Sequence, residues 1–280
     1  MEINVPTPLG DAVAAVWRAR ALDDRGLQEP GAQDGFRRAL AADLGRAYTD
    51  WTDAVRAALA APPHAVVVRD RGPGRAAALL AALAVALGEM MNPYRDLVPG
   101  SPVLQEIVPK GPSSPDRVWL WHTDSANWPE PNDLSALACL RAAPVGGATQ
   151  VLSLATLRAH PAWRADLLAP LWEAEVEWPV DSFLGGGTFR ARAITADRLR
   201  FRRELLAGRG SGAFQRAVDG FAAASDAAAP DVSALLRPGD VLVFDNRRAM
   251  HRAGPVRDPQ RRRRLLRTKI RQRPGRWRHL

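Results

Sequence analysis

After residue 92 the chain consists of short apolar runs bounded by proline and glycine, and this pattern limits the folds open to it. Short apolar runs with such punctuation predict β-strands. We expect eight strands, at residues 103–108, 117–122, 135–141, 149–152, 174–178, 198–201, 241–244 and 265–271. Two helical stretches interrupt them, at 154–171, with a break near His160-Pro161, and at 213–228. Strands that do not alternate regularly with helices predict a jelly roll, or double-stranded β-helix barrel, and not a βαβ fold.

The first 91 residues have a different pattern. Between residues 11 and 61, apolar side chains recur at steps of three and four, which predicts helix, and Pro62-Pro63 ends it. Residues 64–68 predict one short strand, and Gly72-Pro73-Gly74 begins a second helix that runs to about Met91. We therefore predict one domain, residues 1–280: a helical N-terminal portion with one strand (1–91) caps a mainly β, cupin-like core with helical insertions (92–280).

Three features bear on the compartment. The longest apolar stretch, residues 76–87, is shorter than the roughly 20 residues of a membrane span. The N-terminus has no charged region leading into an apolar signal core. The single cysteine, Cys139, cannot form an internal disulfide and fits a reducing compartment, where it is expected to be a small buried side chain on a strand. We expect a cytoplasmic protein without a membrane span.

The net charge of +9 is concentrated at one end. Residues 247–280 contain thirteen arginines and one lysine against one acid, Asp258, a net charge of +13, so the remaining residues carry −4. Such an end could bind RNA or an acidic carrier protein. Base-stacking aromatics are scarce there, with Trp277 alone, and two lysines against thirty-seven arginines indicate GC-rich codon usage as much as a selected surface. A binding module of this kind is the second hypothesis.

The first hypothesis starts from His122-Thr123-Asp124, which follows an apolar run. Residues two apart on a strand share a face, so the imidazole and the carboxylate can point at one ion. They are two-thirds of the facial triad that holds iron(II) in non-haem oxygenases. The third ligand should be a distant histidine on a facing strand or the turn beside it. His251 fits best, because it follows the buried strand 241–244; the other candidates are His64, His160 and His279.

Several further segments extend this pattern. They are Trp121 to Asp124, Pro129-Glu130-Pro131 leading into 134–141, Pro144 to Thr149 with its double glycine, Gly239 to His251, and Arg263 to Arg267. In order, spacing and identity they resemble the taurine dioxygenase and clavaminate synthase superfamily of iron(II)- and 2-oxoglutarate-dependent oxygenases. The resemblance covers roughly the C-terminal two-thirds of the chain, and the first ninety residues match only in general character.

The resemblance implies a role for six residues. Iron is bound by His122, Asp124 and His251, and 2-oxoglutarate is contacted by Thr149, Arg263 and Arg267. Arg263 would pair with the distal carboxylate of the co-substrate, which suits the bidentate fork of a guanidinium, and alternation along a strand puts Arg267 on the same face. The choice among Arg261, Arg263 and Arg264 stays open.

The activity implied is hydroxylation of an unactivated C–H bond with O2, 2-oxoglutarate and iron(II). Asp124 argues against halogenation, because related halogenases replace this carboxylate by a small residue. The expected substrate is a small molecule, an amino acid or a metabolite derived from one, free or carrier-tethered, in natural-product (antibiotic) biosynthesis; desaturation and cyclisation are alternatives. Oligomeric state is left open. Candidate substrate contacts are Gln105, Glu106, Asn127, Asp181 and Arg190.

Overall fold

The computed structural model describes residues 1–20, 26–70, 72, 74–91, 102–108, 119–182, 185–258 and 262–272. Its α-helices are α1 (Thr7–Ala19), α2 (Pro30–Ala60), α3 (Ala76–Leu87), α4 (Leu154–Ala159), α5 (Ala165–Leu168), α6 (Pro170–Glu173), α7 (Arg203–Leu206) and α8 (Gly212–Ala227), with a 3-10 turn, η1 (Gly26–Gln28). The strands are β1 (Glu2–Asn4), β2 (Ala65–Arg69), β3 (Glu89–Met90), β4 (Gln105–Ile107), β5 (Leu134–Arg141), β6 (Val145–Gly146), β7 (Thr149–Ser153), β8 (Val176–Pro179), β9 (Thr188–Ala191), β10 (Val232–Ala234), β11 (Val241–Asp245), β12 (Ala249–Ala253), β13 (Val256–Arg257) and β14 (Arg264–Arg271).

The larger sheet has the order β1-β2-β11-β5-β14-β3, and β4 adds to β14. Only the β1–β2 pair is parallel among the described pairs. Because side chains alternate along a strand, Ala136 and Ala138 of β5 point to one face of the sheet, while Leu137 and Cys139 point to the other. The first face meets helices, and the second faces the interior of the barrel-like core.

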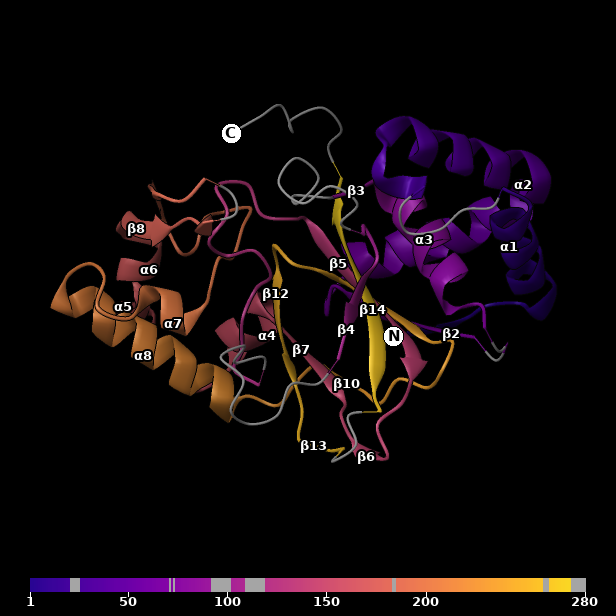
Figure 1. Ribbon diagram of the computed structural model, residues 1–280. Helices are drawn as coiled ribbons and strands as arrows, with labels where there is room; N and C mark the ends of the chain where they lie inside the picture. Colours follow the sequence, from indigo (N-terminus) through magenta and orange to yellow (C-terminus); the bar gives the residue numbers. More distant parts are fainter. Residues whose placement is uncertain are drawn as a thin grey trace.

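The helices α1, α2 and α3 cover the outer face of this sheet (Figure 1). The sequence of α3 is entirely apolar, which fits a helix that other elements surround. Leu79, Leu80 and Leu83 of α3 are fully buried, and each contributes about 1.5–3 kcal/mol by leaving water. The helices α1 to α3 therefore bury the outer face of the larger sheet, and its inner face is left for the site.

A smaller sheet, with the order β10-β7-β12, forms the facing wall. Apolar side chains fill the space between the two sheets, including Leu137, Val151, Phe244 and Leu265. On the far side of the smaller sheet lie the helices α5 to α8 and the β8–β9 hairpin, opposite α1 to α3 (Figure 1). This arrangement of two facing sheets between two helical layers is the expected cupin-like, jelly-roll core.

Six of the eight expected strands are confirmed, each within one or two residues at both ends. Two are wrong in the described part of the chain. Residues 119–121 and 198–201 are not strands, although His122 and Leu199 each form isolated bridges; residues 117–118 lie outside the described residues. His122 bridges to His251 on the edge strand β12, and Leu199 bridges to Ile194, so single bridges replace a regular ladder. None of the unexpected strands contains three consecutive apolar residues, so the sequence offered no apolar run at these places; they are β1, β3, β6, β9, β10, β12 and β13.

The predicted helices are present in the described part of the chain, and one of them ends earlier than expected. The expected helix over residues 11–61 is α1, η1 and α2, and residues 21–25 lie outside the described part. The stretch 154–171 divides into α4, α5 and α6 around the expected break, and 213–228 is α8. The second N-terminal helix ends earlier than expected, because Gly88 ends α3 and Met90 joins β3. Within the described residues, no helix has both the length and the apolar character of a membrane span.

Gly88 gives a testable consequence of this packing. A Cβ atom at Gly88 would lie 2.1 Å from the backbone oxygen of Arg271 on β14, so Gly88→Ala must displace the strand that carries the inward-facing arginines. We expect a loss of about 1–3 kcal/mol in the free energy of unfolding, measured by urea denaturation. Gly35 in α2 is the control, since a Cβ there meets nothing within 4 Å; Gly35→Ala should stabilise by about 0.5–1 kcal/mol. If Gly88→Ala and Gly35→Ala changed the free energy of unfolding equally, the close contact between Gly88 and Arg271 would be contradicted.

Candidate functional site

His122 and His251 are joined through their backbones. His251 lies on β12, and its N–H donates to His122 O at 2.9 Å, while the N–H of His122 donates to His251 O at 3.1 Å. This two-way bridge extends the smaller sheet by one residue and brings the imidazole rings to 4.2 Å between centroids. The facing position expected for the third ligand is therefore confirmed by the pairing, although His122 lies on a bridge and not on a strand.

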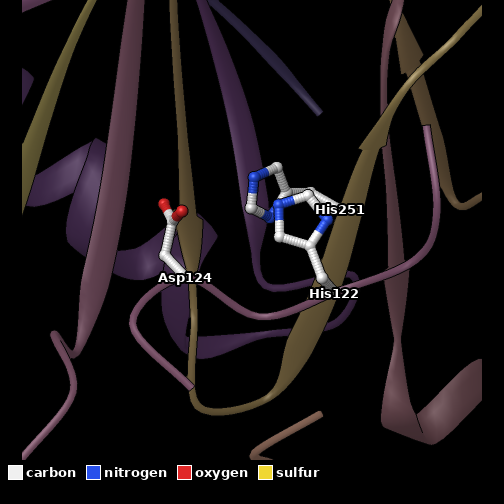
Figure 2. Close-up of side chains that lie close together, drawn as sticks. All are labelled: His122, Asp124 and His251. Carbon is white, nitrogen blue, oxygen red and sulfur yellow. The ribbon is translucent and has the colours of Figure 1, made fainter. Parts of the chain in front are cut away.

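Asp124 completes the group from the turn that follows (Figure 2). One possible ligand atom from each of the three residues lies within 4.8 Å of the others, and all three side chains are buried. Figure 2 shows the carboxylate of Asp124 facing the two imidazole rings across a gap. Two nitrogen donors and one carboxylate, close enough to share an ion, form the facial-triad donor set.

Three neighbours fix the position of Asp124. Its backbone N–H donates to Asn246 Oδ1 at 2.7 Å, and Asn246 Nδ2 donates back to Asp124 O at 3.0 Å. Ser135 Oγ donates to Asp124 Oδ2 at 2.7 Å, and Arg267 Nη1 lies 3.3 Å from Oδ1. Such outer contacts orient a ligand and tune its basicity. They leave the carboxylate rigid before any ion binds.

The protonation states suit a divalent ion. Burial, helped by the neighbouring His251, lowers the pKa of His122 to about 3, and burial also lowers the pKa of His251. Burial opposes the charge of Asp124, but the nearby Arg267 and the other cationic groups hold the pKa of that carboxyl below its usual range. Two neutral imidazoles and one carboxylate are the ligand forms that bind metal without first losing a proton.

The hydrogen bonds of the imidazoles agree with this. His122 Nδ1 lies 2.8 Å from Leu120 O, so Nδ1 carries the proton and Nε2 keeps its lone pair for a metal. His251 Nδ1 is buried and has no hydrogen-bond partner in the described part of the chain. The donor set and its protonation fit an iron(II) ion.

Arg263 and Thr149 lie together beside this group. Arg263 is buried, and its Nη2 donates to Gly147 O at 2.8 Å and approaches Thr149 Oγ1 at 3.5 Å. Burial lowers the pKa of Arg263, and no carboxylate of the described residues lies within ion-pair distance of its guanidinium. Arg264, by contrast, is half exposed and pairs with Glu106 at 2.8 Å, and Arg261 lies outside the described residues. The buried, unpaired guanidinium is that of Arg263.

Arg267 lies four residues farther along β14, on the same inward face. Its Nη1 contacts Asp124, and its Nη2 donates to Gln105 Oε1 on β4 at 3.0 Å. The register of β14 against β5 is shifted between Arg264 and Leu265 by a bulge on β5, so the alternation along β14 itself is kept. The geometry thus brings Gln105, Arg267 and Asp124 into one contact group.

The other substrate candidates divide into two groups. Asn127 is buried in the turn after Asp124, and Asp181 Oδ2 accepts from Trp128 Nε1 at 3.2 Å beside the same turn. Glu106 points away from the interior toward Arg264. Arg190 is exposed on β9 and donates to Glu175 O. The structure brings Gln105, Asn127 and Asp181 toward the triad, and it does not bring Glu106 or Arg190 there.

The arginine-rich end is largely occupied by internal contacts where it is described. Arg252 pairs with Asp226, Arg264 with Glu106, Arg271 with Glu130, and Arg247 with Asp245. Residues 273–280, which contain three arginines and no acid, lie outside the described residues. In the described part these arginines hold the fold together, which weakens the nucleic-acid hypothesis.

Four site residues were missed in the sequence. Ser135 is a polar residue within the apolar strand β5, and Asn246 directly follows the buried strand β11, so both gave a signal. Lys269 lies among the arginines of β14, and its signal was its place two residues beyond Arg267, on the same face. Arg200 gives no such signal. Its guanidinium is buried, lies over the rings of Phe189 and Trp178, and donates to the backbone oxygens of residues 126, 128 and 129. Burial lowers its pKa to about 9.

Arg200 therefore fastens the turn that carries Asp124. Arg200→Met would leave three backbone oxygens without their donor, and we expect the free energy of unfolding to fall by about 2–4 kcal/mol. Chemical denaturation measures this. Arg203→Met is the control, because Arg203 is half exposed and pairs with the exposed Asp219, so its loss should change stability by less than about 0.5 kcal/mol. If Arg200→Met and Arg203→Met lowered the free energy of unfolding equally, the turn would be held by contacts other than those of Arg200.

Comparison with known proteins decides among the classes of protein that this geometry allows. The profile described as "Taurine catabolism dioxygenase TauD, TfdA family" matches residues 25–269. The chain belongs to the TauD/TfdA family. The match begins within the N-terminal helices, so the first ninety residues, which resemble the family only in general character, are for the most part inside it. No curated protein sequence matches the chain.

Solved structures of similar fold agree with the TauD/TfdA assignment. One is the non-haem iron oxygenase OrfP with Fe, succinate and (3S)-hydroxy-L-Arg, at 19% identity and a TM-score of 0.76, covering 98% of this chain and 94% of that one. Another is asparagine oxygenase with Fe(II), 2S,3S-3-hydroxyasparagine and succinate, at 19% identity and a TM-score of 0.73, covering 97% and 93%. OrfP with Fe and alpha-ketoglutaric acid has 20% identity and a TM-score of 0.71, covering 98% and 95%.

The family assignment confirms the dioxygenase class expected from the sequence. The expected His-Asp-His donor set for iron is present, and the structural neighbours were solved with Fe and with alpha-ketoglutaric acid or succinate. The individual roles of Thr149, Arg263 and Arg267 stay predictions.

Proposed function

We propose that this enzyme hydroxylates an unactivated C–H bond of a small amino acid or amino-acid derivative, using iron(II), 2-oxoglutarate and O2. The observation that carries the proposal is the buried triad of His122, Asp124 and His251 beside the unpaired guanidinium of Arg263. A metal triad alone serves many reactions. A metal triad next to a buried, uncompensated cation is suited to a co-substrate that binds metal at one end and carries a carboxylate at the other.

The residues divide between metal and co-substrate. His122 Nε2, His251 and the Asp124 carboxylate would hold the iron, and Ser135, Asn246 and Arg267 keep Asp124 in place. Arg263, with the hydroxyl of Thr149 at 3.5 Å, would bind the distal carboxylate of 2-oxoglutarate. Arg267 would contact the co-substrate near the metal, from its place beside Asp124.

When bound, iron(II) with 2-oxoglutarate supplies the oxidising chemistry: O2 is consumed, the co-substrate becomes succinate and CO2, and one oxygen atom enters the substrate. The chain supplies order and exclusion of water. His122 and His251 enter as neutral ligands, so no proton has to leave before metal binds. The retained carboxylate of Asp124 occupies the position that a halide would need, which favours hydroxylation over halogenation.

The proposed substrate class rests on the residues around the triad and on the neighbours. OrfP and asparagine oxygenase were solved with hydroxylated arginine and hydroxylated asparagine. Gln105 and Asp181 place an amide and a carboxylate near the site, which suits the polar groups of an amino acid. We include in the proposal a role in natural-product biosynthesis and a cytoplasmic location, the latter supported by the free, buried Cys139.

The test is succinate formation with iron(II), O2 and 2-oxoglutarate across a panel of the proteinogenic amino acids and their simple derivatives. We expect one small group of amino acids to stimulate succinate formation and to gain 16 mass units, while the rest leave the slow background rate unchanged. Mass spectrometry separates hydroxylation from desaturation, which removes 2 mass units. A panel without any stimulation, together with a salt-sensitive RNA gel shift at physiological salt, would overturn the proposal in favour of the binding-module hypothesis.

A further inference from the structure

Lys269 is a buried lysine to which the proposed function assigns no role in binding iron, 2-oxoglutarate or the amino acid. It is one of two lysines in the chain, and its side chain is 7% exposed. On β14 it lies two residues beyond Arg267, so both side chains point between the sheets. Directly opposite on β5 is Ser135, whose hydroxyl donates to the Asp124 carboxylate. Lys269 therefore enters the same interior as the metal ligands, one inward position farther from Arg263 than Arg267.

The ammonium group of Lys269 is only partly satisfied. Its Nζ donates to Ser125 Oγ at 2.8 Å and lies 3.9 Å from the centroid of the Trp128 ring. No carboxylate of the described residues lies within ion-pair distance of Nζ. An ammonium has three N–H donors, so two of them find no acceptor among the described residues. Burying such a cation is costly, and a ring face offsets only part of that cost.

The turn after Asp124 builds the surroundings of this lysine. Ser125 has a φ of 54°, a left-handed conformation that is uncommon outside glycine and is often found at functional sites. This conformation turns the chain so that Asp124 faces the histidines while Ser125 and Trp128 face Lys269. The indole N–H of Trp128 in turn donates to Asp181. One short turn thus links the metal ligand, the lysine and an acidic side chain.

The charges of the site leave Lys269 without compensation. Burial, helped by the nearby Arg267, lowers the pKa of Lys269 to about 7, while Asp124 and Asp181 act in the opposite direction. Arg267 already pairs with Asp124, and Asp181 lies beyond ion-pair distance of Lys269. The two charges of iron(II) and the two of 2-oxoglutarate cancel one another, and Arg263 adds a further positive charge. Among the described residues no anion is left to pair with Lys269, and the carboxylate of a bound substrate could fill that role.

We propose that Lys269 is the substrate anchor and binds a free carboxylate of the amino acid, while Asp181, across the Trp128 ring, accepts from its ammonium group. This inference rests on the proposed function and names the substrate class: an amino acid with an unblocked carboxylate. The carboxylate has two possible sources, the α-carboxylate or an acidic side chain. An α-carboxylate would make the substrate a free amino acid, because tethering to a carrier consumes that group.

The test compares the most stimulating amino acid of the panel with its α-amide and, where it has an acidic side chain, with its side-chain amide. Lys269→Met keeps the length of the side chain and removes its charge. We expect Lys269→Met to raise the KM for the amino acid roughly 10- to 100-fold, the range for losing a charged hydrogen bond, with the KM for 2-oxoglutarate within twofold. The wild type should discriminate strongly against one of the two amides, and that amide identifies the source of the carboxylate.

The decisive quantity is the ratio of KM for that amide to KM for the acid. It should fall toward one in Lys269→Met and recover in part in Lys269→Arg, whereas a purely structural role would raise both KM values together. Arg164→Met is the matched control, because Arg164 is exposed and pairs only with Asp166 among the described residues. Its ratio should equal that of the wild type. Discrimination by the wild type tests the carboxylate anchor even if Lys269→Met does not fold, and the ratio in Lys269→Arg then tests the assignment to Lys269; a ratio unchanged from the wild type in the Lys269 variants would contradict it.

Two further results would overturn the inference alone. Wild-type enzyme that hydroxylates the acid and both amides with similar KM values has no carboxylate anchor. A Lys269→Met variant whose KM for 2-oxoglutarate rises as much as that for the amino acid places Lys269 in the co-substrate site. In both cases substrate-stimulated succinate formation would still support the oxygenase function. Absence of stimulated succinate formation by the wild type would overturn both proposals together.

Discussion

His251→Ala is expected to lower substrate-stimulated succinate formation by more than about 100-fold, because that factor is the upper range for losing even an outer partner of a metal ligand. The variant removes one of three donors whose ligand atoms lie within 4.8 Å of one another. Iron bound after anaerobic loading and gel filtration should fall in parallel. The fold should survive, since the backbone bridge to His122 does not need the imidazole.

Two variants calibrate this result. Ser135→Ala removes only the hydroxyl that donates to Asp124 Oδ2, so iron affinity should fall by about 10- to 100-fold, less than in His251→Ala. His160→Ala changes the histidine that follows α4, whose Nδ1 accepts from the backbone N–H of Ala162, and should leave iron binding unchanged. A His251→Ala protein with wild-type coupled activity would show that the metal is held elsewhere.

Arg263→Met should raise the KM for 2-oxoglutarate by about 30- to 1000-fold, corresponding to the roughly 2–4 kcal/mol of a buried, charged hydrogen-bonded pair. The buried guanidinium beside Thr149 has no acidic partner among the described residues, so its charge is available to the distal carboxylate. The KM for the amino acid should change little. Initial rates at varied 2-oxoglutarate, with the amino acid saturating, give this constant.

The neighbouring arginine supplies the control. Arg264 is adjacent in sequence, half exposed and paired with Glu106, so Arg264→Met should leave the KM for 2-oxoglutarate within twofold. Arg263→Lys should recover only part of the affinity, because an ammonium cannot reproduce the bidentate fork. If Arg264→Met raised the KM for 2-oxoglutarate as much as Arg263→Met, the assignment of the distal carboxylate to Arg263 alone would be wrong.

The metal ligands could be predicted from the sequence for two reasons: two of them form a short local motif, and the third follows a distinctive buried strand. His122 and Asp124 are two residues apart, and His251 follows a buried strand that any reader of the apolar pattern would place in the core. Strands such as β12 were missed because their sequences lack a strand signal: β12 is Ala-Met-His-Arg-Ala and contains no β-branched residue, Phe, Tyr or Trp. The pairing of β12 with β7 is set by contacts distant in the sequence.

The support around the ligands was not predictable in the same way. Ser135 and Lys269 meet only because β5 and β14 pair in one particular register. Arg200 reaches the turn at residues 126–129 from more than seventy residues away. Glu106 was expected near the substrate from its place beside Gln105, but adjacent residues on a strand point to opposite faces, and the partner of Glu106 is the half-exposed Arg264.

The most direct test of the central claim is an anaerobic titration of the protein with iron(II) and 2-oxoglutarate, followed by visible absorption. A keto acid that chelates iron in this triad should produce an iron-to-2-oxoglutarate charge-transfer band that saturates at one iron per chain. The band should be absent in His251→Ala, and Arg263→Met should require far more 2-oxoglutarate to reach it. Wild-type protein that binds iron(II) but develops no such band at saturating 2-oxoglutarate would contradict the account.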